Sequence, residues 1–388
     1  MKNKIYIYIF TEFLSFFLVI LFTLTAIVWT IQAVNFLELV TEDGHAFSVF
    51  FLYSILGLPK TIARLIPFTF LVAITLTILK LEKDNELIVL WTSGLNKMKL
   101  VNIILVISFL ITFTQLILAT SISPFSLNQS RAMLKSSDLK LFPSLLKEKK
   151  FNDTVKNLTV FVEEKHDDGT IKNIFLRDDT KKDISQTISA QRGYIKKDRN
   201  STFLILYTGI IEREKLDGQI NSINFDTTTI NLSTFSTKTI TWPKVQEKSS
   251  IYLLSCALWY NKEIVKSFFI NSEYIMSKLG ILTNKNCYKK NDVTSELNRR
   301  FGMPLYIPLL SLMVCYLLSS RNENRKTDIT KYFCFFIGFF ILVFAEIALR
   351  YSGKIFYITI LYYILPLIIL IINYLILFKI FKYENLRS

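Results

Sequence analysis

Six long apolar stretches dominate the pattern of hydrophobic and polar positions along the chain. A helix needs about 20 apolar residues to cross the hydrocarbon of a bilayer, and these stretches approach or exceed that length. They cover residues 7–34, 50–79, 101–118, 303–318, 332–349 and 356–378. Three precede and three follow a polar middle segment, so the pattern predicts a polytopic α-helical membrane protein with six transmembrane helices in a 3+3 arrangement.

The middle segment changes to short runs in which apolar and polar residues alternate, which is typical of strands with one buried face. These runs cover residues 157–162, 171–176, 187–195, 203–211 and 220–232, with turn-forming residues at 166–170, 198–200 and 216–219. The spacing predicts an inserted all-β domain, either a sandwich or a partly open β structure. A polar, partly helical stretch should precede it, and helix should follow from 251 to 300. We therefore expect domains at 1–120, 121–300 and 301–388.

Composition supports a membrane protein. Of the 388 residues, 51% are hydrophobic and 33 are Phe, with a mean hydropathy of +0.37. One aqueous core could not bury so much apolar surface. The net charge of +15 does not indicate nucleic-acid binding, because Lys and Arg are spread over loops and the middle domain instead of one helix or strand.

The distribution of basic residues predicts the orientation of the chain. If the helices alternate across the membrane, most loop cations fall on one side: Lys2, Lys4, Lys80, Lys83, Lys97, Lys99, Arg321, Arg325, Lys326, Lys331, Lys379, Lys382 and Arg387. The other side offers Arg350 and Lys354, and its first loop is acidic. The positive-inside rule then places both termini in the cytoplasm and the middle domain outside. The first apolar stretch is too long for a signal peptide and is expected to remain uncleaved.

No catalytic or metal-binding arrangement is found in the sequence. The two histidines, His45 and His166, lack the neighbours of a zinc site, and no phosphate-binding loop of the G-x-x-x-x-G-K-[ST] type occurs. We therefore expect no cofactor and no enzymatic activity in this chain. Carboxylates near the membrane deserve notice because they are costly there. Glu346 is expected either to pair with Arg350 at i,i+4 or to face a substrate.

Four cysteines are present. Cys315 and Cys334 lie in apolar stretches and should behave as small apolar residues. Cys256 and Cys287 fall on the predicted outer side, where an oxidising compartment would permit a disulfide. Sequence alone does not place their Cα atoms within bridging distance, so both paired and free forms are open.

The loop between the second and third apolar stretches predicts a short amphipathic helix at about 82–95. Glu82, Asp84 and Glu86 stand where acidic residues favour a helix start. Leu87, Leu90 and Trp91 share one face, and Gly94 is placed to end the helix. Such a helix could rest on the membrane surface, or it could dock in a groove of a separate motor protein.

Residues 81–95 (LEKDNELIVLWTSGL) resemble the coupling-helix segment of the LptF/LptG (YjgP/YjgQ) lipopolysaccharide export permeases. Further similarities are Tyr8-x-x-x-Glu12, Pro59-Lys60 with Pro67, and residues 296–305 (ELNRRFGMPL) before the fourth stretch. The last segment and residues 353–355 are more similar to LptF than to LptG. The resemblance covers essentially the whole chain.

The resemblance implies a jellyroll-like periplasmic domain and a permease subunit in the bacterial inner membrane. Its expected partners are an LptG-like second permease, an LptB-like ATPase dimer, and LptC- and LptA-like bridge proteins. Glu86, Leu87, Leu90 and Trp91 would couple to the ATPase. An anionic lipid needs apolar walls and cations for its phosphates, for which the candidates are Lys60, Arg64, Arg350 and Lys354. Gln32 and Asn35 depart from the family, whose members often carry Lys or Arg at the end of the first span.

Two other classes of protein are open. The chain could be a permease of another motor-driven system, such as the FtsX/MacB-like mechanotransmission proteins, although those typically have four spans. It could also be a membrane sensor with an outer domain. The sequence contains no set of catalytic residues that would favour an enzyme. It also contains no cytoplasmic signalling domain that would favour a receptor.

Overall fold

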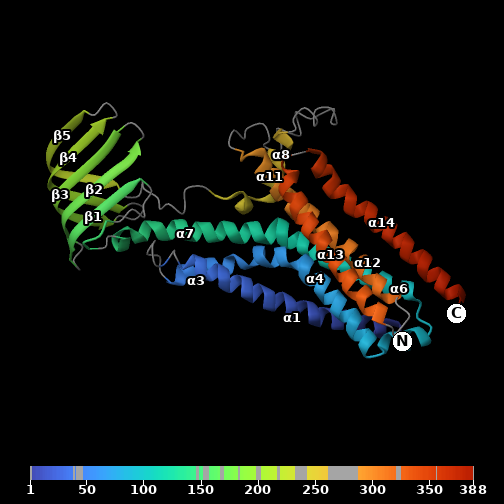
Figure 1. Ribbon diagram of the computed structural model, residues 1–388. Coiled ribbons are helices and arrows are strands. Elements are labelled where there is room, and N and C mark those ends of the chain that lie inside the picture. Colours follow the sequence, from blue (N-terminus) through green and yellow to red (C-terminus); the bar gives the residue numbers. More distant parts are fainter. Residues whose placement is uncertain are drawn as a thin grey trace. The chain divides into compact units, whose positions relative to one another are not determined.

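Helices make up most of the described part of the chain, and an antiparallel sheet interrupts them (Figure 1). The computed structural model describes residues 2–37, 40, 47–145, 148–151, 157–166, 170–181, 184–197, 202–215, 219–231, 243–260, 287–319, 325–354 and 356–387. Two compact units result. The helical unit comprises Met1–Trp29, Gly57–Leu127 and Lys244–Ser388, and the sheet unit comprises Thr30–Leu56 and Asn128–Pro243.

The described helices before the sheet are α1 (Lys2–Phe36), α3 (Phe47–Leu56), α4 (Leu58–Lys83), α5 (Glu86–Thr92), α6 (Lys97–Ile117), η1 (Leu118–Ile122) and α7 (Ser123–Leu145). Those after it are η4 (Val245–Glu247), α8 (Ser250–Tyr260), α11 (Lys290–Leu297), η6 (Asn298–Gly302), η7 (Met303–Leu305), α12 (Tyr306–Cys315), η8 (Tyr316–Ser319), α13 (Arg325–Ser352) and α14 (Phe356–Arg387).

Within the described residues, six helical stretches are long and apolar enough to cross a membrane, which confirms the six predicted apolar helices. They cover Lys4–Phe36, Phe47–Lys83, Lys97–Leu134, Lys290–Leu318, Tyr332–Ser352 and Tyr357–Lys382. The fourth is central, since 72% of its most apolar window is buried, against 11% for the first. Outward-facing side chains of α1, α13 and α14 include Phe22, Phe340 and Ile371. Such a surface suits lipid as its solvent.

Close helix packing in the helical unit depends on small residues and aromatic rings. Gly338 in α13 lies against Leu71 of α4, where an added Cβ would meet the leucine Cδ1 at 2.7 Å. Phe13 of α1 packs on Phe70 of α4, with ring centroids 5.5 Å apart. Gly338 lets α13 approach α4 closely, and the two rings fill the space between α1 and α4, so van der Waals contact joins the helices as membrane bundles require.

The third long helix continues without a break past the predicted end at residue 118. The chain passes from α6 through the π-helical turn η1 into α7. A second π-helical segment, η6, joins α11 to η7 and α12. Single π turns inside longer helices often occur at functional sites.

All five predicted strands are present as β1 (Leu158–Lys165), β2 (Thr170–Lys181), β3 (Ile184–Lys197), β4 (Thr202–Lys215) and β5 (Ile220–Asn231). They form one antiparallel sheet in sequence order, β1-β2-β3-β4-β5 (Figure 1). Leu158, Val160 and Val162 alternate as buried residues and begin the core of this sheet. The alternation that predicted the strands is therefore the alternation of their two faces.

Consecutive order makes the described sheet a meander, whereas a jellyroll requires Greek-key connections. Asn173 and Thr208 have φ angles of 48° and 50° within β2 and β4, respectively. Such positive angles mark local irregularities of strand pairing. The predicted turn residues 167–169, 198–200 and 216–218 lie outside the described residues, as does 261–286 in the segment expected to be helical.

Cys256 and Cys287 form a disulfide, with Cα atoms 5.8 Å apart, which decides the question that the sequence left open. The bond joins α8 to the segment before α11. Leu253 and Val293, both fully buried, pack beside it together with Leu297. Cys315 and Cys334 are free and buried, as expected for residues of apolar helices.

Candidate functional site

A polar cavity of about 230 Å³ lies within the helical unit. Its walls come from α4, from the α6–η1–α7 helix, from η4, from α11 with η6 and η7, and from α13. The charged and amide-bearing residues that line it are Lys60, Arg64, Gln115, Gln246, Glu296, Arg299, Arg300 and Glu346. Ionisable groups inside a membrane bundle are costly and usually face such cavities, so this cavity is the candidate site.

Helix α4 brings Lys60 and Arg64 to the cavity. The helix begins at Leu58 with Pro59 in its first turn, where the missing N–H of proline costs nothing. Residues four apart share one helix face, so Lys60 and Arg64 line the same wall. Neither makes a hydrogen bond or an ion pair with another residue of the described ranges. Lys60 is half-buried and Arg64 is exposed to the opening.

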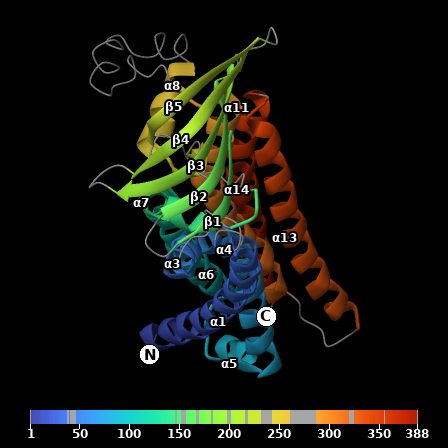
Figure 2. The same ribbon diagram turned by 90° about the vertical axis from the view of Figure 1, so that its left-hand side faces the viewer.

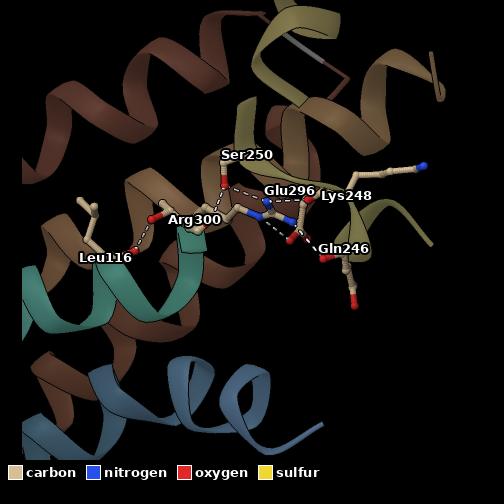
Figure 3. A network of polar contacts seen from close by, with 7 residues as sticks. Leu116, Gln246, Lys248, Ser250, Glu296 and Arg300 are labelled. Atoms are coloured by element: carbon tan, nitrogen blue, oxygen red, sulfur yellow. Dashed lines mark hydrogen bonds and ion pairs between the residues drawn. The ribbon is translucent and has the colours of Figure 1, made fainter. Parts of the chain in front are cut away.

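Arg300 is a structural residue of the cavity wall. Its side chain is only 2% exposed, and its guanidinium donates four hydrogen bonds (Figure 3). The acceptors are Glu296 Oε1 at 3.0 Å, the Lys248 carbonyl at 3.0 Å, Ser250 Oγ at 2.9 Å and the Gln246 carbonyl at 3.0 Å. These four acceptors, one of them a carboxylate, offset the cost of burying the charge. Arg300 therefore joins η6 to residues 246–250, which follow the sheet in the sequence.

The network extends to the third long helix. Ser250 Oγ, which accepts from Arg300, donates to the Thr120 carbonyl of η1 at 2.6 Å. Arg300 thus links η6 to η1 through one hydroxyl group.

Arg299, the adjacent residue on η6, has a different environment. Its Nη2 lies 2.9 Å from Glu346 Oε1 of α13, and the two side chains are 25% and 42% exposed. The expected i,i+4 pairing of Glu346 with Arg350 is thus replaced by a pair with a residue 47 positions away. Successive residues of a helix point in different directions, so one arginine is sequestered and the other faces the cavity.

Two buried polar atoms at the cavity have no hydrogen-bond partner among the described residues. Gln115 donates through Nε2 to the Ala63 carbonyl at 3.0 Å, but its Oε1 is unpaired. Ser123 Oγ is also unpaired. These side chains are 2% and 6% exposed. Buried polar atoms normally have partners, so the cavity suits an occupant with polar groups.

The cavity carries an excess of positive charge. Four cations line it against two carboxylates, and both carboxylates are engaged, Glu296 by Arg300 and Glu346 by Arg299. The excess therefore resides on Lys60 and Arg64. A site with two cations without partners at its wall favours an anionic ligand.

The other two predicted substrate residues do not line this cavity. Arg350 lies exposed in the last turn of α13. Lys354 is exposed and places its Nζ 5.8 Å from the centre of the Tyr351 ring. The structure thus brings Lys60 and Arg64 together, and it separates them from Arg350 and Lys354. The sequence did not identify Arg299, Gln115 and Ser123 as site residues, although Arg299 lies in the family-like segment 296–305.

The predicted amphipathic helix is present as α5, but it begins at Glu86. Glu82 belongs to the last turn of α4, and Asn85 between the helices has a φ of 59°. Gly94, with a φ of 79°, follows the helix as predicted. Leu87 is buried, and Leu90 and Trp91 pack against the same helical core. Their apolar face therefore holds α5 onto its own chain, whereas Ile88 and Val89 point outward.

Helix α5 is bound to α1 at the end of the unit where the N-terminus lies (Figure 2). Tyr8 donates through its hydroxyl to Glu86 Oε1 at 2.8 Å. One turn further, Glu12 pairs with Lys80 of α4 at 2.5 Å. Lys97 at the start of α6 lies 5.8 Å from the Trp91 ring and 5.6 Å from the Phe381 ring of α14. In the Tyr8-x-x-x-Glu12 motif, the tyrosine therefore contacts the start of α5 and the glutamate contacts the last turn of α4, on either side of the connection between these helices.

Six bilayer-length helices, an inserted sheet and a cationic cavity among the helices define a multi-pass membrane protein built around a polar site. Residues 7–380 match the family described as "Lipopolysaccharide export system permease LptF/LptG". The chain belongs to this family. It is also 26% identical over 310 residues to an uncharacterised protein of Rickettsia prowazekii (strain Madrid E), RP871, with 79% of this chain and 80% of the relative covered.

Family membership makes the chain a permease subunit of a lipopolysaccharide export system in the inner membrane, and a transporter component instead of an enzyme in its own right. It also implies a complex that contains a second permease and an ATPase. Within the described ranges, no group of three or more His, Cys, Asp or Glu side chains could hold a metal ion.

Proposed function

We propose that this chain is one half of a permease pair that extracts lipopolysaccharide from the outer leaflet of the inner membrane, driven by an LptB-like ATPase dimer. The partner half is LptG-like, and this chain takes the LptF position. Residues 296–305 and 353–355 support that position. The two membrane halves, three spans each, enclose the substrate path together with the partner permease.

The observation that carries the proposal is the pair of cavity cations without partners, Lys60 and Arg64. In a membrane bundle, two cations without a protein partner are retained only where an anion or a water-filled path meets them. A lipid that carries phosphates supplies such an anion, and the apolar helices around the cavity suit its acyl chains. Lys60 and Arg64 therefore bind substrate phosphate, and Arg350 and Lys354 guide the headgroup outside the cavity.

The orientation we propose follows from the positive-inside rule, with both termini in the cytoplasm and the sheet unit in the periplasm. The disulfide between Cys256 and Cys287 supports this orientation, because disulfides persist in oxidising compartments. The sheet unit, completed to a jellyroll, passes the substrate to LptC- and LptA-like bridge proteins.

Helix α5 couples the chain to the ATPase. Leu87, Leu90 and Trp91 seat the helix on its own bundle, so that Glu86 and the outward residues Ile88 and Val89 meet the groove of the motor. The short connection to α4 lets motion of the helix reach Lys60 and Arg64, which stand at the other end of α4.

Affinity purification of the full-length chain from its own membranes tests the proposal. We expect an ATPase dimer, a second six-span permease and lipopolysaccharide to purify with it. Lys60→Glu should reduce bound lipopolysaccharide and export, whereas Lys60→Gln should have a smaller effect, because contact with phosphate depends on the sign of the charge. Purification with a MacB-like motor in place of an LptB-like one, or without any ATPase, would instead favour a mechanotransmission protein or a sensor.

A further inference from the structure

The two ion pairs at the cavity differ in a way that indicates different roles. Glu296 and Arg300 are 13% and 2% exposed, and Arg300 has three further hydrogen bonds. Glu346 and Arg299 are 42% and 25% exposed, and one contact of 2.9 Å joins them. Because partly exposed pairs are worth only about 0–1 kcal/mol, an incoming anion can separate the second pair but not the first.

We propose that Glu346 is an internal competitor for the substrate anion, which holds Arg299 while the cavity is empty and gives it up when a lipid phosphate arrives. This inference rests on the proposed function of the cavity and deepens it. Arg299 becomes a third cation for the phosphate, beside Lys60 and Arg64. On release of the lipid, the carboxylate of Glu346 returns to Arg299 and displaces the anion.

The geometry of the cavity supports an exchange of partners at this place. Arg299, Glu346, Lys60 and Arg64 all line the same volume. A phosphate monoester carries about −1.5 to −2 charges and three acceptor oxygens, so it can satisfy more than one cation. A guanidinium presents a fork of donors that matches phosphate as well as carboxylate. Both anions therefore compete for the same face of Arg299.

Two independent atoms indicate that the cavity receives a polar ligand. Gln115 Oε1 and Ser123 Oγ are buried, unpaired in the described part of the chain, and line the cavity wall. Hydroxyl groups of a headgroup would satisfy both, whereas an apolar chain would leave both unsatisfied. The ligand class is thus a phosphorylated, hydroxyl-bearing lipid headgroup.

A transporter gains from such a competitor because very tight binding would prevent release. Three cations that converge on one phosphate in a low dielectric would bind it strongly. An acid on α13 that competes for one of them lowers the affinity without removing any binding residue. A movement that brings Glu346 closer to Arg299 would then favour release.

The experiment measures lipid binding by the full-length complex in phosphatidylcholine nanodiscs, with dioctanoyl phosphatidate as a soluble probe. Glu346→Gln keeps the shape of the side chain and removes its charge, and we expect it to bind phosphatidate about fivefold more tightly than the parent. Arg299→Gln should bind more weakly. The double variant should match Arg299→Gln, since the competitor acts through that arginine.

Asp292→Asn is the control for net charge, because it makes the same change on an exposed residue of α11 outside the cavity lining. If Glu346→Gln binds no more tightly than the parent, or if Asp292→Asn tightens binding equally, the proposal is overturned. Glu346→Ala gives the same comparison if the glutamine variant does not fold, and the melting temperature of each variant reports folding.

A second arm separates this inference from the proposed function. The same variants are tested for lipopolysaccharide that purifies with them. If phosphatidate binding responds as expected but no variant and no parent protein carries lipopolysaccharide, the competitor is supported and the proposed substrate is wrong. In the opposite outcome, the parent protein carries lipopolysaccharide, but Glu346→Gln retains no more of it and binds phosphatidate no more tightly. That outcome supports lipopolysaccharide as the substrate and overturns the role of Glu346 as a competitor.

Discussion

Arg299 and Arg300 are neighbours in sequence, and they differ completely in environment. One is buried with four hydrogen bonds, and the other shares a single, partly exposed carboxylate. A sequence pattern can mark both arginines as notable, but it cannot say which of them is structural. That distinction depends on partners 47 to 54 residues away, which arrive only when η4, α8 and α13 pack around η6.

We predict that Arg300→Gln destabilises the helical unit. The change leaves Glu296 without its cation and two carbonyls without donors, which costs about 3–5 kcal/mol for a buried charge. Thermal unfolding of the purified protein should show a large fall in melting temperature. Arg299→Gln is the matched control, and equal losses for both variants would contradict the assignment of Arg300 as the structural residue.

Local elements were the most predictable part of the molecule. The five strands could be predicted because alternating faces and turn residues are both local signals, and the six apolar helices because length alone distinguishes them. Helix α5 shows the limit of such signals. Acidic residues at 82, 84 and 86 suggested one start, but Asn85 adopts a positive φ and separates α5 from α4. Which face of α5 is buried depends on α1, α6 and α14.

For α5 we predict that Glu86→Ala weakens the association with the ATPase more than it lowers the amount of folded protein. The carboxylate is partly exposed and has one described partner, the hydroxyl of Tyr8, so its loss should cost little stability. ATPase recovered per folded permease is the measurement. Asp84→Ala, an equal charge change in the turn before α5, is the control. Unchanged recovery for Glu86→Ala and Glu86→Arg would leave α5 as a surface helix without a coupling role.

The disulfide between α8 and the segment before α11 is expected to stabilise this part of the protein. The two cysteines are 31 residues apart, and a closed loop of that size stabilises a protein by about 3.5–4 kcal/mol. The double change Cys256→Ser and Cys287→Ser should lower the melting temperature. Under non-reducing conditions, thiol labelling of the unfolded parent protein should find two free cysteines, Cys315 and Cys334. Four labelled thiols would show that the bond does not form in the cell.

The arrangement of the whole chain follows from solvent as much as from packing. The apolar pattern suits helices in lipid, and we expect the basic loops to set their direction. The cavity could be predicted only in part. Lys60 and Arg64 are visible as two cations on one helix face, but their meeting with Arg299 and Glu346 joins residues more than 230 positions apart. No local pattern reports such a contact.

For the whole chain we predict cytoplasmic labelling near Lys97 and Leu386 and periplasmic labelling near His166 and Gln219. Single cysteines at these positions should react with a membrane-impermeant maleimide in intact cells only on the periplasmic side. Lysed cells serve as the control for reactivity at every position. Reaction at Lys97 in intact cells, together with protection of the sheet unit, would reverse the orientation and remove the basis for ATPase docking at α5.

The cavity beside Lys60 is proposed to hold the phosphate of lipopolysaccharide during export. The most direct measurement places a photo-crosslinking amino acid at position 60 of the chain in actively exporting membranes. We expect it to capture lipopolysaccharide, and we expect the Arg64→Glu variant to reduce the yield because it reverses the charge of a cavity cation. Absence of any lipopolysaccharide adduct at position 60, in membranes that export normally, would contradict the binding of lipopolysaccharide phosphate in this cavity.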